Sequence, residues 1–329
     1  MIATADSNRR WRRIFLIVGA IVAAYALLAP LTSLDAVQSA NVPLLADKFW
    51  FRIATFIVMF IVMATAWNII GGITGYAAFG NVAFFGIGAY TTGMLVAKAK
   101  WPFLVALPLA PVVAALFAAL IGLPLLRLRG HYFAVASLGV GVAVGELVQN
   151  IDYGGQPVFG GASGLFLPIY AVDNRGLFFF YLMAAAVLGV NTTAYKVAAF
   201  ALSAALTGLA GGIFSQWNVF INQDNAFPIE YNVQMILMAL LGGAGTIFGP
   251  AAGAVLLQLL IQFLGGTLPI SFDLPFVSTD ARPIVAQVIL GLLLVGVVIF
   301  VPRGVIDFFG GRTRLSLSYL RRSLRETSL

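Results

Sequence analysis

Long apolar stretches, each close to twenty residues, recur along the whole chain. The longest uncharged one lies between Arg52 and Lys98 and contains 45 residues. A helix needs about 20 apolar residues to cross a bilayer, and it satisfies its own backbone hydrogen bonds there. The pattern therefore predicts an all-α polytopic membrane protein with about 8–10 transmembrane helices and glycine-interrupted elements in both halves.

Ten crossings can be drawn along the chain. They cover residues 14–31, 53–70, 75–97, 103–126, 131–149, 177–190, 195–214, 232–246, 248–264 and 284–301. At a rise of 1.5 Å per residue, the spans 177–190, 232–246 and 248–264 reach only about 21–26 Å, less than a hydrocarbon core of about 30 Å. These three are expected to be half-helices or re-entrant segments. If 177–190 does not cross, nine spans remain and the C-terminus changes side.

Two apolar blocks are interrupted by glycine, one in each half. The first runs from Gly71 to Tyr90 and includes Asn81, and the second runs from Leu241 to Pro250. Loosened backbone is tolerated in a membrane where it is buried in protein or lines a wet cavity, so the pair predicts a transport pathway. Close helix packing remains the expectation for any single glycine. The candidate pathway-lining residues are Gly75, Phe79, Gly80, Asn81, Phe84, Phe85, Gly242, Gly243, Gly245 and Thr246.

Composition agrees with this assignment. The chain is 61% hydrophobic and 9% charged, which is too apolar for a soluble globule of 329 residues. It contains no cysteine, so disulfides, a thiol nucleophile and cysteine metal sites are excluded. Neither a cofactor nor a bound metal is expected.

Charge indicates an orientation. On the ten-span drawing, 13 of the 19 basic residues lie on the side of the N-terminus and eight of the twelve acids lie on the other side. Basic residues favour the cytoplasmic side, so both termini are predicted to be cytoplasmic in a bacterial inner membrane. The expected organisation is a basic N-terminus (1–13), one transmembrane permease domain (14–302) and a basic tail (303–329).

Few residues could perform chemistry. His131 is the only histidine, and no P-loop sequence is present, so we expect no enzyme and no ATP hydrolysis by this chain. Glu146 lies near the outer end of the span 131–149. An intramembrane carboxylate is a functional candidate by default, either for proton coupling or for contact with a substrate ammonium group. The simpler interpretation, which we favour from the sequence, is a hydrated helix end.

Seven motifs occur in an order that resembles a known family. They are GYAAFGNVAFFGIGAY (75–90), LRLRGHYFA (126–134), GGASG (160–164), LGVNTTAYK (188–196), ALTGLAGG (205–212), LGGAGTIFGP (241–250) and PRG (302–304). Together they are similar to the permease subunits of bacterial branched-chain amino acid ABC importers, specifically the M-type (LivM-like) subunit. The resemblance covers about residues 55 to 305.

The resemblance implies partners that hydropathy cannot reveal. It implies a homologous H-type permease subunit, two ABC ATPase subunits and a periplasmic or extracellular solute-binding protein, with the solute crossing between the two permeases. Branched-chain amino acids are the expected cargo, and other neutral amino acids, urea and short amides also fit. The alternative is a secondary transporter or channel that works alone and uses Glu146.

One segment departs from the family pattern. Family members carry a basic, amphipathic cytoplasmic segment ahead of the stretch that begins at Leu188, and this segment resembles the coupling helix that engages the ATPases. Here residues 178–187 run directly into Leu188. The resemblance therefore implies impaired or altered ATPase coupling, with Gly189, Asn191, Tyr195 and Lys196 left as the candidate cytoplasmic coupling residues.

Overall fold

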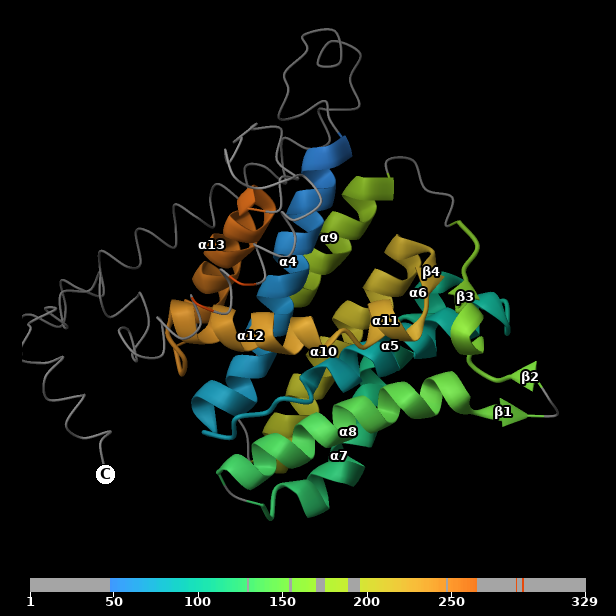
Figure 1. The fold of residues 1–329 in the computed structure, drawn as a ribbon. Helices are drawn as coiled ribbons and strands as arrows, with labels where there is room; N and C mark the ends of the chain where they lie inside the picture. Colours follow the sequence, from blue (N-terminus) through green and yellow to red (C-terminus); the bar gives the residue numbers. More distant parts are fainter. Residues whose placement is uncertain are drawn as a thin grey trace, which may run out of the picture.

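The computed structural model describes residues 48–264 except 129, 154–155, 170–174, 189–195 and 247, together with residues 288 and 292. The described residues exclude the predicted span 14–31, the span 284–301 apart from residues 288 and 292, both terminal segments, and the candidates Gly189, Asn191 and Tyr195. The described part is built from helices (Figure 1), which are α4 (Lys48–Asn68), α5 (Asn81–Ala97), α6 (Phe103–Ala106), α7 (Leu109–Leu125), α8 (His131–Asn150), α9 (Arg175–Leu188), α10 (Lys196–Asn218), α11 (Gln223–Ala226), α12 (Ile229–Gly242) and α13 (Gly249–Leu264). This confirms the predicted all-α polytopic membrane class.

Four of the described helical segments are long and apolar enough to cross a membrane. They are Arg52–Ile73, Phe103–Leu125, His131–Asn150 and Ala198–Asn218. Each coincides with a predicted span. Of the three spans that were expected to be short, α12 is short, with 14 residues. The described parts of α9 and α13 contain 14 and 16 residues and border residues outside the described ranges.

Two predicted boundaries are wrong, and glycines explain both. The span predicted over 75–97 begins as helix only at Asn81, because Gly75 has a φ of +76° and residues 74–80 are not helical. The span predicted over 232–246 ends at Gly242, because Gly243 has a φ of +115°. Hydropathy sees the apolar composition of these segments but not their backbone conformation.

The core forms around α10, which packs against α5, α7 and α4. Glycines allow the closest approach between α5 and α10. A Cβ atom on Gly88 would lie 1.9 Å from the Gly208 carbonyl oxygen, and one on Gly211 would lie 1.9 Å from the Phe85 carbonyl oxygen. Small residues let membrane helices pack backbone to backbone, so close packing accounts for these glycines.

The helices differ strongly in burial. The apolar parts of α4 and α10 are 78% and 72% buried, whereas those of α6 with α7 and of α8 are only 28% and 22% buried. Leu116 and Leu120 on α7 and Val135 on α8 are each about two-thirds exposed or more. A membrane protein covers such an apolar surface with lipid or with a second polypeptide.

Short strands fold the connection between α8 and α9. Strand β1 (Asp152–Tyr153) pairs with β2 (Gln156–Pro157), and β3 (Leu165–Phe166) pairs with β4 (Phe220–Ile221) after α10. A turn of 3-10 helix, Gly161–Ser163, lies between the two pairs. The β3–β4 pair fixes this connection to the end of α10, next to the residues that begin α11.

Candidate functional site

The first glycine-interrupted block folds back on the helix that precedes it. Helix α4 continues into one turn of π-helix, Ile69–Ile73, and the chain then leaves the helical conformation. The Trp67 indole N–H donates to the Ala78 carbonyl at 2.7 Å. A Cβ atom on Gly71 would lie 2.4 Å from the Trp67 ring, so a glycine is needed where the ring covers the backbone.

Asn68 joins this block to the second one. Its Oδ1 accepts a hydrogen bond from the Gly245 N–H at 2.8 Å, and its Nδ2 donates to the Thr246 carbonyl at 2.8 Å. Beside it, a Cβ atom on Gly72 would lie 2.4 Å from the Gly245 nitrogen. Two segments that are about 177 residues apart in sequence therefore meet. The Asn68 amide joins them, and the absence of a side chain on Gly72 leaves room for the contact.

The second block forms a tight connection between α12 and α13. The Thr246 hydroxyl donates to the Gly243 carbonyl at 2.7 Å and accepts from the Gly249 N–H at 3.0 Å, at the start of α13. A Cβ atom on Gly242 would lie 1.7 Å from the Gly249 carbonyl oxygen. The glycines thus allow two short helices to fold against each other.

The start of α5 is held by polar side chains from three other helices. The Val82 N–H donates to Asn232 Oδ1 of α12 at 2.9 Å, and the Phe79 N–H donates to Ser137 Oγ of α8 at 3.0 Å. Asn81 Nδ2 donates to Ser203 Oγ of α10 at 3.2 Å. The bond from Val82 satisfies a backbone donor that the first turn of a helix leaves free.

The predicted pathway residues divide by exposure. Gly75, Gly245 and Thr246 are exposed and Phe79 is half-buried, whereas the other six candidates are buried. The Phe84 ring contacts the Phe200 ring with centroids 5.3 Å apart, and the Phe85 ring packs near Phe214 at 5.2 Å. These two phenylalanines therefore lie in the packed interior of the chain.

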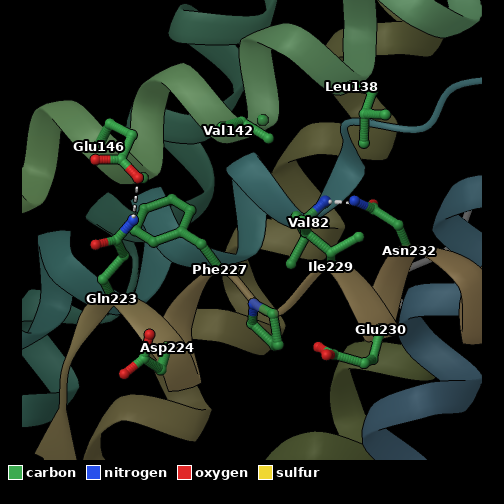
Figure 2. Close-up of a pocket in the computed structure, with 13 residues that line it drawn as sticks. Val82, Leu138, Val142, Glu146, Gln223, Asp224, Phe227, Ile229, Glu230 and Asn232 are labelled. Carbon is green, nitrogen blue, oxygen red and sulfur yellow. Dashed lines mark hydrogen bonds between the residues drawn. The ribbon is translucent and has the colours of Figure 1, made fainter.

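A pocket of about 300 Å³ lies beside the start of α5 (Figure 2). Its walls come from α8, α11, α12 and the first turn of α5. The lining residues are Val82, Leu138, Gly141, Val142, Gly145, Glu146, Gln223, Asp224, Phe227, Pro228, Ile229, Glu230 and Asn232. Three of the lining side chains are carboxylates and none is basic.

Glu146 is exposed on the last turns of α8, at one end of this pocket. Its carboxylate accepts from Gln223 Nε2 at 3.3 Å and from Asn150 Nδ2 at 3.3 Å. Amide donors hold the carboxylate in place but do not neutralise it. Glu146 is thus both a hydrated helix end and a wall of the pocket.

Several residues of these sites could not be predicted from the sequence. Asn68 and Asn232 were not predicted, although each is a polar residue within an apolar run. Gln223, Asp224 and Glu230 gather around a short connection whose polar composition suggests only a loop. Of the coupling candidates, Lys196 forms the first residue of α10. No group of three or more His, Asp or Glu side chains suited to a metal ion occurs within the described ranges.

Comparison with known proteins gives one family. The family model described as "Branched-chain amino acid transport system / permease component" matches residues 49–180 and 182–298. The high-affinity branched-chain amino acid transport system permease protein LivM of Salmonella typhimurium is 26% identical and that of Escherichia coli is 24% identical, each over 274 residues, 65% of this chain and 63% of the relative. The match thus spans less than two thirds of the relatives' length. No solved structure matches this chain.

The comparisons show that this chain lacks residues that its relatives have. Since 65% of the 329-residue chain is about 214 residues, about 60 of the 274 aligned positions lie opposite gaps in this chain. The family match is itself divided into two parts at Tyr181, within α9. The relatives therefore carry residues inside the matched region that this chain does not have.

Proposed function

This chain belongs to the family of permease components of branched-chain amino acid transport systems, and from that membership we propose that it is a transmembrane subunit of an ATP-binding-cassette importer for branched-chain amino acids. The observation that carries the proposal is the family match, which extends over residues 49–298 with one interruption. The absence of a P-loop sequence agrees with it, because ATP would then be hydrolysed by a separate polypeptide.

The proposal includes a set of partners. A homologous H-type permease would complete the pathway, two ATPase subunits would bind on the cytoplasmic side, and a periplasmic or extracellular binding protein would deliver the solute. The weakly buried faces of α7 and α8 offer an apolar surface for such a second membrane subunit. Both termini are placed in the cytoplasm, following the distribution of basic residues.

The pathway is proposed to pass the exposed members of the glycine-interrupted blocks. Gly75, Gly245 and Thr246 are accessible to a solute, and Phe79 is half-buried between them and the interior. The buried candidates, which include Asn81, Gly242 and Gly243, then shape the wall from behind. Asn68 keeps the two blocks in register, so a change there would affect both.

Coupling to the ATPases is proposed to be altered. The family pattern places a cytoplasmic coupling segment ahead of Leu188, and the family match is interrupted at Tyr181, seven residues before it. The relatives carry residues within the matched region that this chain lacks. We propose that the missing residues include the coupling segment, so this chain has less surface with which an ATPase can engage.

Uptake measurements test the function. The chain is produced with its sister permease, ATPases and binding protein in cells that lack their own branched-chain amino acid importers, and uptake of radiolabelled leucine is measured. We expect uptake that is lost when the ATPase P-loop lysine is replaced. Leucine uptake that persists without active ATPases would contradict the proposal and would favour a transporter that works alone.

A further inference from the structure

The pocket beside α5 carries different polar groups at its two ends. Figure 2 places Glu146, Gln223 and Asp224 at one side and Asn232 with Val82 and Glu230 at the other, with Val142, Phe227 and Ile229 between them. The carboxylates of Glu146 and Asp224 belong to exposed residues, whereas Asn232 is only 1% exposed. Two carboxylates, of Glu146 and Asp224, therefore lie at one end, which we call the mouth, and the buried Asn232 amide lies at the other end near Glu230.

Asn232 has one half of its amide engaged and the other half free. Its Oδ1 accepts from the Val82 N–H at 2.9 Å and so caps α5, while its buried Nδ2 has no hydrogen-bond partner. Buried polar groups in native proteins are nearly always paired, so an unpaired donor that lines a cavity indicates a ligand or a water. The ligand atom that suits Nδ2 is an oxygen acceptor.

The mouth of the pocket, in contrast, suits a ligand group that donates hydrogen bonds or carries a positive charge. Glu146 and Asp224 contribute two carboxylates there, Glu230 contributes a third on the side of Asn232 (Figure 2), and none of the thirteen lining residues is basic. Negative groups that line a concavity raise the local concentration of cations. A divalent metal is a poor fit, because no group of three metal-ligating side chains occurs in the part of the chain that the structure describes. An ammonium group suits isolated carboxylates better.

The wall between the two ends is aliphatic. Leu138 and Val142 of α8 and Ile229 of α12 face the pocket, and the volume of about 300 Å³ is at the small end of the range for ligand sites. We propose that this pocket binds the transported amino acid as a zwitterion, with its ammonium group at Glu146 and Asp224 and a carboxylate oxygen accepting from Asn232 Nδ2. The aliphatic side chain lies against Leu138, Val142 and Ile229.

This inference rests on the proposed function and narrows it. Urea and short amides were compatible with the sequence, and they could accept from Asn232 Nδ2. They carry no positive charge, however, and do not complement the carboxylates of Glu146 and Asp224. The pocket therefore selects an amino acid over a neutral amide, which identifies the class of substrate from the chain itself.

Binding to the full-length chain in lipid nanodiscs tests the inference. The probes are leucine, 3-methylbutylamine, which lacks the carboxylate, and 4-methylpentanoate, which lacks the amine. The informative variant is Asn232→Asp, because a carboxylate oxygen can still accept from the Val82 N–H but the Nδ2 donor is gone. We expect leucine to bind at least tenfold more weakly and 3-methylbutylamine to bind as before or more tightly.

Glu146→Gln is the complementary variant at the mouth. It removes the charge but keeps an oxygen that can accept from Gln223, and we expect weaker binding of leucine and 3-methylbutylamine with unchanged binding of 4-methylpentanoate. Asn218→Asp, an exposed position outside the pocket, is the control that should leave all three affinities unchanged. Thermal unfolding of each variant verifies that the protein is folded.

The outcomes separate this inference from the function on which it rests. In two cases the pocket is not the substrate site and the importer function stands. In the first, the assembled importer takes up leucine but the protein in nanodiscs does not bind it. In the second, the Asn232→Asp and Glu146→Gln variants are folded and bind leucine as the parent does. If the parent neither takes up nor binds leucine, both are overturned. Tight binding of urea with the same affinity in the parent and in Glu146→Gln would also overturn the assignment of a zwitterionic ligand.

Discussion

Asn68 and Gly245 are joined by a hydrogen bond of 2.8 Å, from the Gly245 N–H to the Asn68 Oδ1. The second amide bond, from Asn68 Nδ2 to the Thr246 carbonyl, makes the contact two-sided. Asn68 itself is only 2% exposed. One buried side chain at the end of α4 thus satisfies both a donor and an acceptor of the connection between α12 and α13.

We expect Asn68→Ala to destabilise the protein by about 1–3 kcal/mol, because a backbone donor and a backbone acceptor lose their partner. The measurement is thermal unfolding in detergent. Asn218→Ala is the matched control, since the Asn218 amide makes one exposed hydrogen bond to the Phe220 carbonyl, and a surface change of this kind usually stays within about 0.5 kcal/mol. Equal stability of the two variants would show that the bridge contributes nothing.

Gly72→Ala should disrupt the same junction from the other side. The new methyl group would lie 1.9 Å from Asn68 Oδ1 and 2.4 Å from the Gly245 backbone nitrogen, so Asn68 would have to leave its partners. We expect a loss of about 1–3 kcal/mol from overpacking, and reduced leucine uptake. Gly139→Ala on α8 is the control, because no atom lies within 4 Å of a Cβ placed there. A tolerated Gly72→Ala would contradict the close approach of the two blocks.

Trp67→Phe isolates the indole hydrogen bond from the packing of the ring. The Ala78 carbonyl would lose its donor in a site where Ala78 is 1% exposed, which costs about 1–3 kcal/mol. The comparison is Trp101→Phe, since the Trp101 side chain is 44% exposed. Chemical unfolding of both variants, followed by tryptophan fluorescence, measures the difference. A shift of the midpoint that is no larger for Trp67→Phe would refute the role of this bond.

Weak ATPase coupling can be tested by restoring the missing segment. We expect the parent chain to co-purify poorly with its ATPases and to give little stimulation of ATP turnover by leucine in a reconstituted complex. Inserting the additional residues of the Escherichia coli relative after Tyr181, where the family match is interrupted, should raise both. A glycine and serine linker of the same length is the control. Full stimulation of ATP turnover by leucine in the parent complex would contradict impaired coupling.

Glu146→Gln distinguishes the importer from a transporter that works alone. In the importer, the loss of this charge weakens substrate binding, so uptake is expected to recover at saturating leucine and to remain dependent on ATP. A secondary transporter that uses Glu146 to carry a proton would instead lose uptake at every leucine concentration. Initial rates over a range of leucine concentrations, with and without an ionophore, tell these apart.

The hydropathy pattern was sufficient for the helices but not for their junctions. The long spans near α4, α7, α8 and α10 follow from apolar runs of the right length. The start of α5 at Asn81 does not, because Gly75 and Gly80 are as compatible with an apolar run as with a break. The backbone there is bonded to Trp67, Ser137 and Asn232, which lie outside the predicted span 75–97.

The candidate site shows the same limit. The two glycine-interrupted blocks could be identified, but their contact depends on Asn68, a single polar residue whose partners are about 177 residues away. The pocket is similar, since Glu146 was identified as an isolated acid, while Asn232 and Asp224 join it only when α8, α11 and α12 come together. Contacts over such separations leave no periodic signal in one sequence.

The capping of α5 by Asn232 has a mechanical consequence. If α12 moved away from α5 during a transport cycle, the Val82 N–H would lose its acceptor. If α4 moved away from α13, the Gly245 N–H and the Thr246 carbonyl would lose their hydrogen bonds to Asn68. Helices α4, α5, α12 and α13 are therefore expected to move as one rigid body, which the hydrogen bonds of Asn68 and Asn232 hold together. Ser137 of α8 accepts from the Phe79 N–H just before α5, so α8 is tied to the same body at this point.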